Sequence, residues 1–205
     1  MNNTHSSSHG NAVSGSDTHP SHSTAPRIDN QTGLPNREAL LCEIQQRVLE
    51  ADRYFMDLST MIVAIDRFFE FVEKGDPAVE SVLARVTGVL RKNLRATDLI
   101  SRCGDGRFAV ILPHSNMQQV LIPALRTQQQ IQHPDQLANG KPRSLTSVSI
   151  GIAQLDREES HASLLSRVES ALNAASLAGP SGLYVHDVQS CVNAKNQAMD
   201  LAASC

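Results

Sequence analysis

Short β-branched runs alternate with longer amphipathic segments along most of this chain, and this alternation constrains the fold more than any other feature. Several apolar runs have the composition of buried strands and lie at 60–65, 99–103, 108–112, 146–153 and 183–185. Between them, apolar residues recur at helical spacing in the segments 36–51, 77–90, 117–131 and 162–178. The order predicts an α/β fold, with a central sheet of about five strands covered by helices.

Composition and charge exclude several functional classes. The formal net charge of -3 provides no basic surface, so neither DNA nor RNA is an expected partner. Every apolar run is far shorter than the about 18 residues that span a bilayer. The 4 cysteines are far apart and form no CxxC pair, which predicts reduced thiols rather than a zinc site. We expect a cytoplasmic protein without membrane insertion, bound metal or cofactor.

Two stretches are predicted to lie outside the folded domain. Residues 1–26 contain mostly Ser, Thr, His, Asn and Gly, and so little apolar surface predicts a disordered tail. The histidines in this tail are irregularly spaced, which favours a solvated segment over a metal site. Residues 188–205 are predicted to form a C-terminal tail or short helix, which leaves 27–187 as one domain.

Several short motifs occur in order along this domain. They are DNQTGLPNR at 29–37, IDRF at 65–68, RATD at 95–98, RCGDGRF at 102–108, SIG at 149–151 and a segment at 171–179 that begins Ala-Leu and ends in Gly. The first resembles the DxLTGLxNR opening of GGDEF domains and differs at Gln31. The others fall where that family has its first-strand motif, RxxD, RxGGDEF, SIG and ALYxAKxxGR. The resemblance implies a cyclase-like palm fold with a mostly antiparallel sheet.

The same resemblance bears on catalysis. Active GGDEF domains join two GTP molecules across a dimer, using metal ions held by acidic residues of the first strand and the hairpin. Here Ala64 replaces the first of these acids, Asp66 remains, and Gly106 and Arg107 stand at the two acidic hairpin positions. Asp105 is displaced by one residue, so it should point away unless a bulge or the turn re-aims it. We interpret Asp66 as a carboxylate that caps or orients the following segment, and Arg107 as a solvated or ion-paired side chain.

Positions that the resemblance assigns to substrate binding are changed as well. Gly104 keeps the first glycine of the hairpin motif, but Val72 stands where the family has an Asn that reads guanine. Glu80 aligns with a guanine-reading Asp and could still accept from a guanine edge, whereas Ser176 replaces a phosphate-binding Lys. We therefore expect an inactive domain with no diguanylate cyclase activity.

A product-binding site is the chemistry that the resemblance leaves intact. Arg95 and Asp98 match the RxxD motif that binds cyclic di-GMP in members with product inhibition, and Arg126 lies where a second arginine of that site often sits. An Arg fork can bind guanine O6 and N7 or a phosphate, while Asp can accept from the guanine edge. The alternative is a local ion pair between Arg95 and Asp98, worth about 0.2–0.5 kcal/mol.

Three functions follow from these expectations. The first is a cyclic di-GMP receptor or effector that acts through the RxxD site in cyclic di-GMP signalling. The second is a nucleotide-independent adaptor that binds a protein of the cyclic di-GMP pathway or of pilus or polysaccharide machinery. A GTP-binding regulatory domain ranks third, and a homodimer stays open under each of them.

Overall fold

The computed structural model describes residues 1, 27–132, 146–187 and 190–195. One six-stranded sheet has the order β2-β3-β1-β4-β5-β6, in which β4 and β5 run parallel and every other neighbouring pair is antiparallel. The strands are β1 Leu58–Ile65, β2 Leu99–Gly104, β3 Arg107–Pro113, β4 Val148–Gln154, β5 Leu183–His186 and β6 Cys191–Asn193. The central position of β1 places the end of this strand beside the β2–β3 hairpin.

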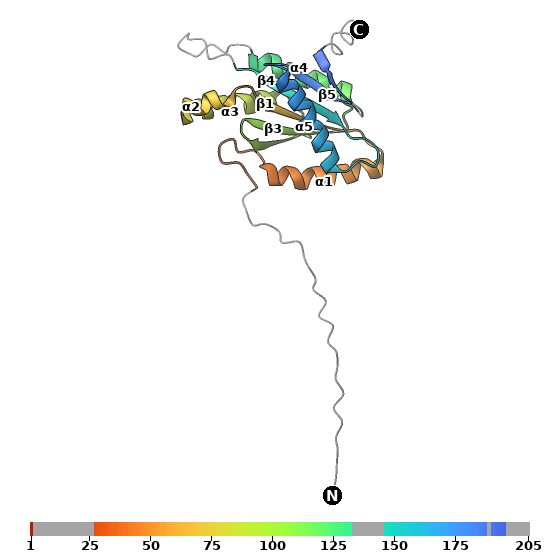
Figure 1. The fold of residues 1–205 in the computed structure, drawn as a ribbon. Helices are drawn as coiled ribbons and strands as arrows, with labels where there is room; N and C mark the ends of the chain where they lie inside the picture. Colours follow the sequence, from red (N-terminus) through yellow and green to blue (C-terminus); the bar gives the residue numbers. More distant parts are fainter. Residues whose placement is uncertain (2–26, 133–145, 188–189, 196–205) are drawn as a thin grey trace.

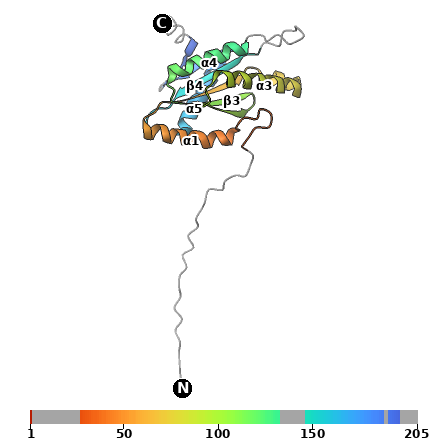
Figure 2. The ribbon, with the colours of Figure 1, turned by 180° about the vertical axis from the view of Figure 1, so that it is seen from behind.

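Helices cover both faces of the sheet (Figures 1 and 2). They are α1 Arg37–Tyr54, α2 Phe68–Glu73, α3 Asp76–Asn93, α4 Met117–Gln132 and α5 His161–Leu177. Helices α1 and α5 pack on one face, while α3 and α4 pack on the other and lie in front of the sheet in Figure 2. Within the described ranges, none of these helices is both long and apolar enough to cross a bilayer.

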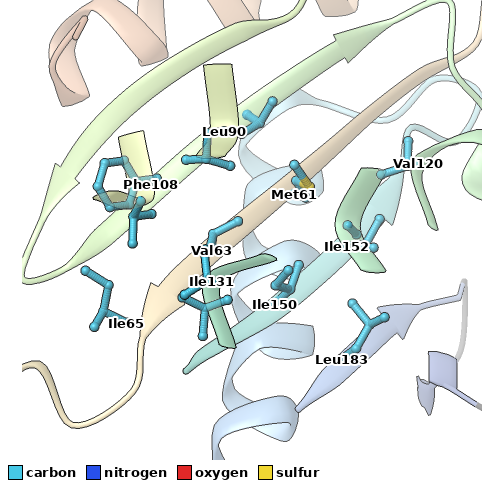
Figure 3. Close-up of a cluster of buried hydrophobic side chains, with 14 of the residues drawn as sticks. Met61, Val63, Ile65, Leu90, Phe108, Val120, Ile131, Ile150, Ile152 and Leu183 are labelled. Carbon is cyan, nitrogen blue, oxygen red and sulfur yellow. The ribbon is translucent and has the colours of Figure 1, made fainter. Parts of the chain in front are cut away.

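Alternating side chains of the central strands pack into two hydrophobic cores, one on each face of the sheet. On β1, Met61, Val63 and Ile65 belong to the core under α3 and α4, and their neighbour Ile62 belongs to the core under α1 and α5. Figure 3 shows the first of these cores, in which Phe108 of β3 lies among aliphatic side chains from the helices and strands. This two-sided burial explains why the central strands are apolar throughout rather than alternating with polar residues.

The glycine of the SIG motif lets α5 approach the sheet closely. A Cβ atom at Gly151 would lie 2.2 Å from the backbone nitrogen of Leu172 and 2.6 Å from the carbonyl oxygen of Val168. Any larger residue would therefore push α5 away from β4. The close contact fixes α5 against β4, on the face of the sheet opposite α3 and α4.

The predicted fold class is confirmed, and the predicted helices and strands match the observed ones to within a few residues. The sheet has six strands rather than about five. The additional strand β6 lies within 188–205, so the prediction that this whole segment is a tail or helix was wrong. Helix α2 was not predicted because six residues are too few for a periodic pattern. The N-terminal tail from residue 2 to 26, with its histidines, and residues 196–205 lie outside the described residues.

Candidate functional site

A cavity of about 300 Å³ lies between the end of α3, strand β3 and helix α4. Three of its lining residues are Arg95 and Asp98, from the turn after α3, and Arg126 from α4. Half of the remaining lining residues are polar and half are apolar: Asn93, Ser115 and Gln119, and Leu112, Ile122 and Pro123. The structure therefore brings the three residues predicted to bind a ligand to one cavity, although Arg126 is far from the other two in the sequence.

Asp98 both holds the turn and leaves an acceptor unused. Its Oδ2 accepts a hydrogen bond from the backbone N–H of Arg95 at 2.7 Å, and its own N–H donates to the Arg95 carbonyl at 3.0 Å. The Oδ1 atom is buried and has no hydrogen-bond partner. Burial raises the pKa of the Asp98 carboxyl above its ordinary value, although the bond from the Arg95 amide and the charge of Arg95 oppose this shift. The alternative of an ion pair between the side chains of Arg95 and Asp98 was wrong. Asp98 accepts from the backbone N–H of Arg95, and the Arg95 side chain is exposed.

The β2–β3 hairpin has an irregular tip. The strand register shifts between Arg102 and Gly104, and three consecutive residues have positive φ angles, 90° at Gly104, 42° at Asp105 and 71° at Gly106. Asp105 is exposed in this turn, and Arg107, also exposed, pairs in register with Ala64 of β1. The turn thus carries the carboxylate of Asp105. The left-handed backbone of the turn sets its position, and the alternation of side chains along the strand does not.

An aromatic side chain fills the space beside the hairpin. A Cβ atom at Gly106 would lie 2.6 Å from Cγ of Phe68, the first residue of α2, and the Gly106 carbonyl accepts a hydrogen bond from Ile65 at 3.0 Å. The Arg102 guanidinium lies 5.9 Å from the centre of the Phe68 ring and 5.2 Å from that of the Phe108 ring. Burial lowers the pKa of Arg102 below its ordinary value. Glycine is therefore required at position 106 for this packing as well as for its backbone conformation.

Asp66 joins three separate parts of the chain. Its Oδ2 accepts hydrogen bonds from the Ser147 hydroxyl at 2.6 Å and the Ser181 N–H at 2.9 Å, and its Oδ1 accepts from the Ser149 hydroxyl at 2.6 Å. Asp66 does not cap the segment after it, because α2 follows Arg67 without any side-chain cap, and its carboxylate accepts from the three serines instead. Sequence reasoning missed these partners because they lie 81, 115 and 83 residues away.

The other changed positions lie on three different helices. Val72, Glu80 and Ser176 are all exposed, and they lie on α2, α3 and α5 respectively. Val72 is 55% exposed, and its neighbour Phe69 on the same helix is 60% exposed. Among the described residues, no group of three or more His, Cys, Asp or Glu side chains is arranged to hold a metal ion.

Comparison with known proteins connects this geometry to a family. The family model described as Diguanylate cyclase, GGDEF domain, matches residues 27–181. Diguanylate cyclase DgcP of Pseudomonas aeruginosa is 34% identical over 160 residues, which are 77% of this chain and 23% of DgcP. Diguanylate cyclase DosC of Escherichia coli is 27% identical over 154 residues, 74% of this chain and 33% of DosC. The chain thus spans only a minor part of the curated relatives that it matches.

Solved structures share the same fold. The GGDEF domain of DgcB from Caulobacter crescentus, solved in complex with c-di-GMP, has a TM-score of 0.74 at 22% identity, over 79% of this chain and 96% of that one. The GGDEF domain of TpbB from Pseudomonas aeruginosa has a TM-score of 0.72 at 26% identity, over 84% of this chain and 99% of that one. Since the family model covers most of the chain and the fold agrees, this protein belongs to the GGDEF domain family.

Proposed function

We propose that this GGDEF domain is a receptor for cyclic di-GMP and has no diguanylate cyclase activity. The observation that carries the receptor role is the cavity in which Arg95, Asp98 and Arg126 meet. Two guanidinium groups can bind guanine O6 and N7 or a phosphate, and the carboxylate of Asp98, which lines the same cavity, can accept from the guanine edge. The solved GGDEF domain of DgcB in complex with c-di-GMP supports this choice of ligand.

The absence of catalysis is proposed from the positions where the family resemblance implies metal-binding carboxylates. Those positions carry Ala64 and Gly106, neither of which can ligate a metal ion through its side chain. Asp66 offers a carboxylate, but three protein donors already use it. Phosphoryl transfer depends on metal ions that neutralise developing charge, so a domain without this site lacks the main source of rate enhancement.

A nucleotide-independent adaptor is the second candidate. The short helix α2 exposes Phe69 and Val72, three residues apart, by 60% and 55% respectively, so the two apolar side chains can share one small surface on this helix. A protein that buries these side chains would need no nucleotide. The adaptor becomes the preferred function if cyclic di-GMP does not bind.

Calorimetric titration of cyclic di-GMP into the wild type and into Arg95→Ala tests the receptor role. The wild type should bind with micromolar or tighter affinity, and the variant should bind about 10- to 100-fold more weakly because it loses a charged hydrogen bond. Arg91→Ala is the matched control, since Arg91 is an exposed arginine on the preceding helix and does not line the cavity. Equal affinities of the three proteins, or binding of GTP in place of cyclic di-GMP, would contradict the proposal.

A further inference from the structure

Ile122 of α4 is a large apolar side chain that lines the cavity and is exposed. It is 61% exposed, whereas its neighbours Val120, Leu121 and Ala124 are buried in the core under α3 and α4. A single exposed aliphatic residue is common on protein surfaces, but this one lies in the same cavity as two arginines. Ile122 therefore gives the cavity apolar surface that a bound ligand can cover.

One face of α4 contributes this part of the lining. Its residues are Gln119, Ile122, Pro123 and Arg126. Their spacing of three, four and seven residues from Gln119 places them on the same side of the helix, in successive turns. The middle turn is apolar, with Pro123 half-buried beside Ile122, and the turns before and after it carry polar side chains. The wall is thus polar, apolar and polar again along the helix.

A nucleobase has surfaces that match such a wall. The two faces of its ring are flat and pack against apolar or aromatic side chains, whereas its donors and acceptors lie along the edge. The turn after α3 supplies Arg95 and Asp98 to the same cavity, and these groups can bind an edge. A cavity of about 300 Å³ is at the lower end of the range for small-molecule pockets, about 300–1,000 Å³, and suits one base of a cyclic dinucleotide.

We propose that Ile122, with Pro123 beside it, is the surface on which the face of one guanine base packs when cyclic di-GMP occupies this cavity. This inference rests on the proposed receptor function. Packing on Ile122 sets the plane of the base, so that its edge meets Arg95 and Asp98. Ile122 thus acts as a positioning residue, and its contribution to affinity comes from buried apolar area rather than from charge.

Calorimetric titration of cyclic di-GMP into Ile122→Ala tests this assignment. The variant should bind about 5- to 30-fold more weakly, because part of an isoleucine side chain no longer covers the base. This factor should be the same at low and high salt, whereas the loss in Arg95→Ala should shrink at high salt because salt screens its charge. Ile122→Leu should keep most of the affinity, since it conserves apolar volume. Leu49→Ala is the matched control, because Leu49 is 65% exposed on α1 and does not line the cavity.

Methyl NMR of the wild type gives a second readout that does not depend on any substitution. The ring current of a base packed on Ile122 should move its methyl signals upfield when cyclic di-GMP is added. The methyl signals of Ile28 should stay in place, because Ile28 is 52% exposed but does not line the cavity.

The outcomes separate this inference from the proposed function. If the wild type binds cyclic di-GMP but the Ile122 methyl signals do not move upfield, or Ile122→Ala binds as tightly as the wild type, only the inference fails. A loss in Ile122→Ala that shrinks at high salt in the same way as that of Arg95→Ala would also overturn it. If the wild type binds no cyclic di-GMP, the proposed function fails and the inference fails with it.

Discussion

Replacing Asp66 with alanine is expected to lower the free energy of unfolding by about 2–4 kcal/mol, because hydrogen bonds to a charged acceptor stabilise by about 1.5–3 kcal/mol each and are not additive. The variant would leave the fully buried hydroxyl of Ser149 and the N–H of Ser181 without their acceptor. The end of β1 would then lose its side-chain link to β4 and to the loop before β5, while the backbone pairing of β1 with β4 would remain. A carboxylate that a GGDEF domain could use for metal binding would thus act here as a structural link.

Urea denaturation of wild type and variant in metal-free buffer measures this effect. Asp52→Ala is a suitable control, because Asp52 is an exposed aspartate on α1, and its loss should change stability by less than about 0.5 kcal/mol. A different pattern would assign Asp66 to metal binding. In that case Asp66→Ala would be as stable as the wild type without metal, and magnesium would stabilise only the wild type.

Gly106→Ala is expected to destabilise the domain by about 2–4 kcal/mol, through backbone strain of about 1–2 kcal/mol and overpacking of about 1–3 kcal/mol. The strain arises because φ at this residue is 71°, and the overpacking because the new Cβ would lie 2.6 Å from Cγ and 2.9 Å from Cβ of Phe68. These atoms are close to the backbone of α2, so rotation of the ring alone cannot remove the clash. Thermal or chemical denaturation gives the difference in unfolding free energy.

Two further variants separate the two contributions. Gly104→Ala has a comparable backbone problem, with φ of 90°, but no atom within 4 Å of the new Cβ, so it reports strain alone. Combining Gly106→Ala with Phe68→Ala should destabilise less than the sum of the two single changes, because the clash partner is absent. Strict additivity would mean that Phe68 does not restrict position 106. If it does restrict this position, restoring an acidic residue at 106 would displace α2 before it could provide a metal ligand.

Local signals in the sequence were sufficient for most of the fold. The helical segment predicted from residue 36 begins where Asn36 caps α1 by accepting from the N–H of Ala39, and the paired apolar runs around Asp105 form a hairpin. Strand β6 is short and partly polar, so nothing in its composition distinguishes Val192 and its neighbours from a tail. Its formation depends on pairing with β5, which is a tertiary contact rather than a local preference.

The candidate site was predictable only in part. Arg95, Asp98 and Arg126 were all identified through the family resemblance, the first two by their match to the RxxD motif. Their common cavity depends on how α4 crosses β3 and could not be derived from the sequence. Contacts such as that of Phe68 with Gly106 join elements whose packing no local pattern specifies.

The most direct test of a cyclic di-GMP receptor site is an NMR titration that follows the backbone amides of isotopically labelled protein. If the proposal is correct, addition of cyclic di-GMP will shift the signals of the turn at 93–98 and of α4 at 119–126, the two segments that contribute most of the cavity lining. The signals of Gly104 and Asp105 at the hairpin tip should change less. Shifts centred on that tip and on Asp66, or no shifts at a large excess of ligand, would contradict the account.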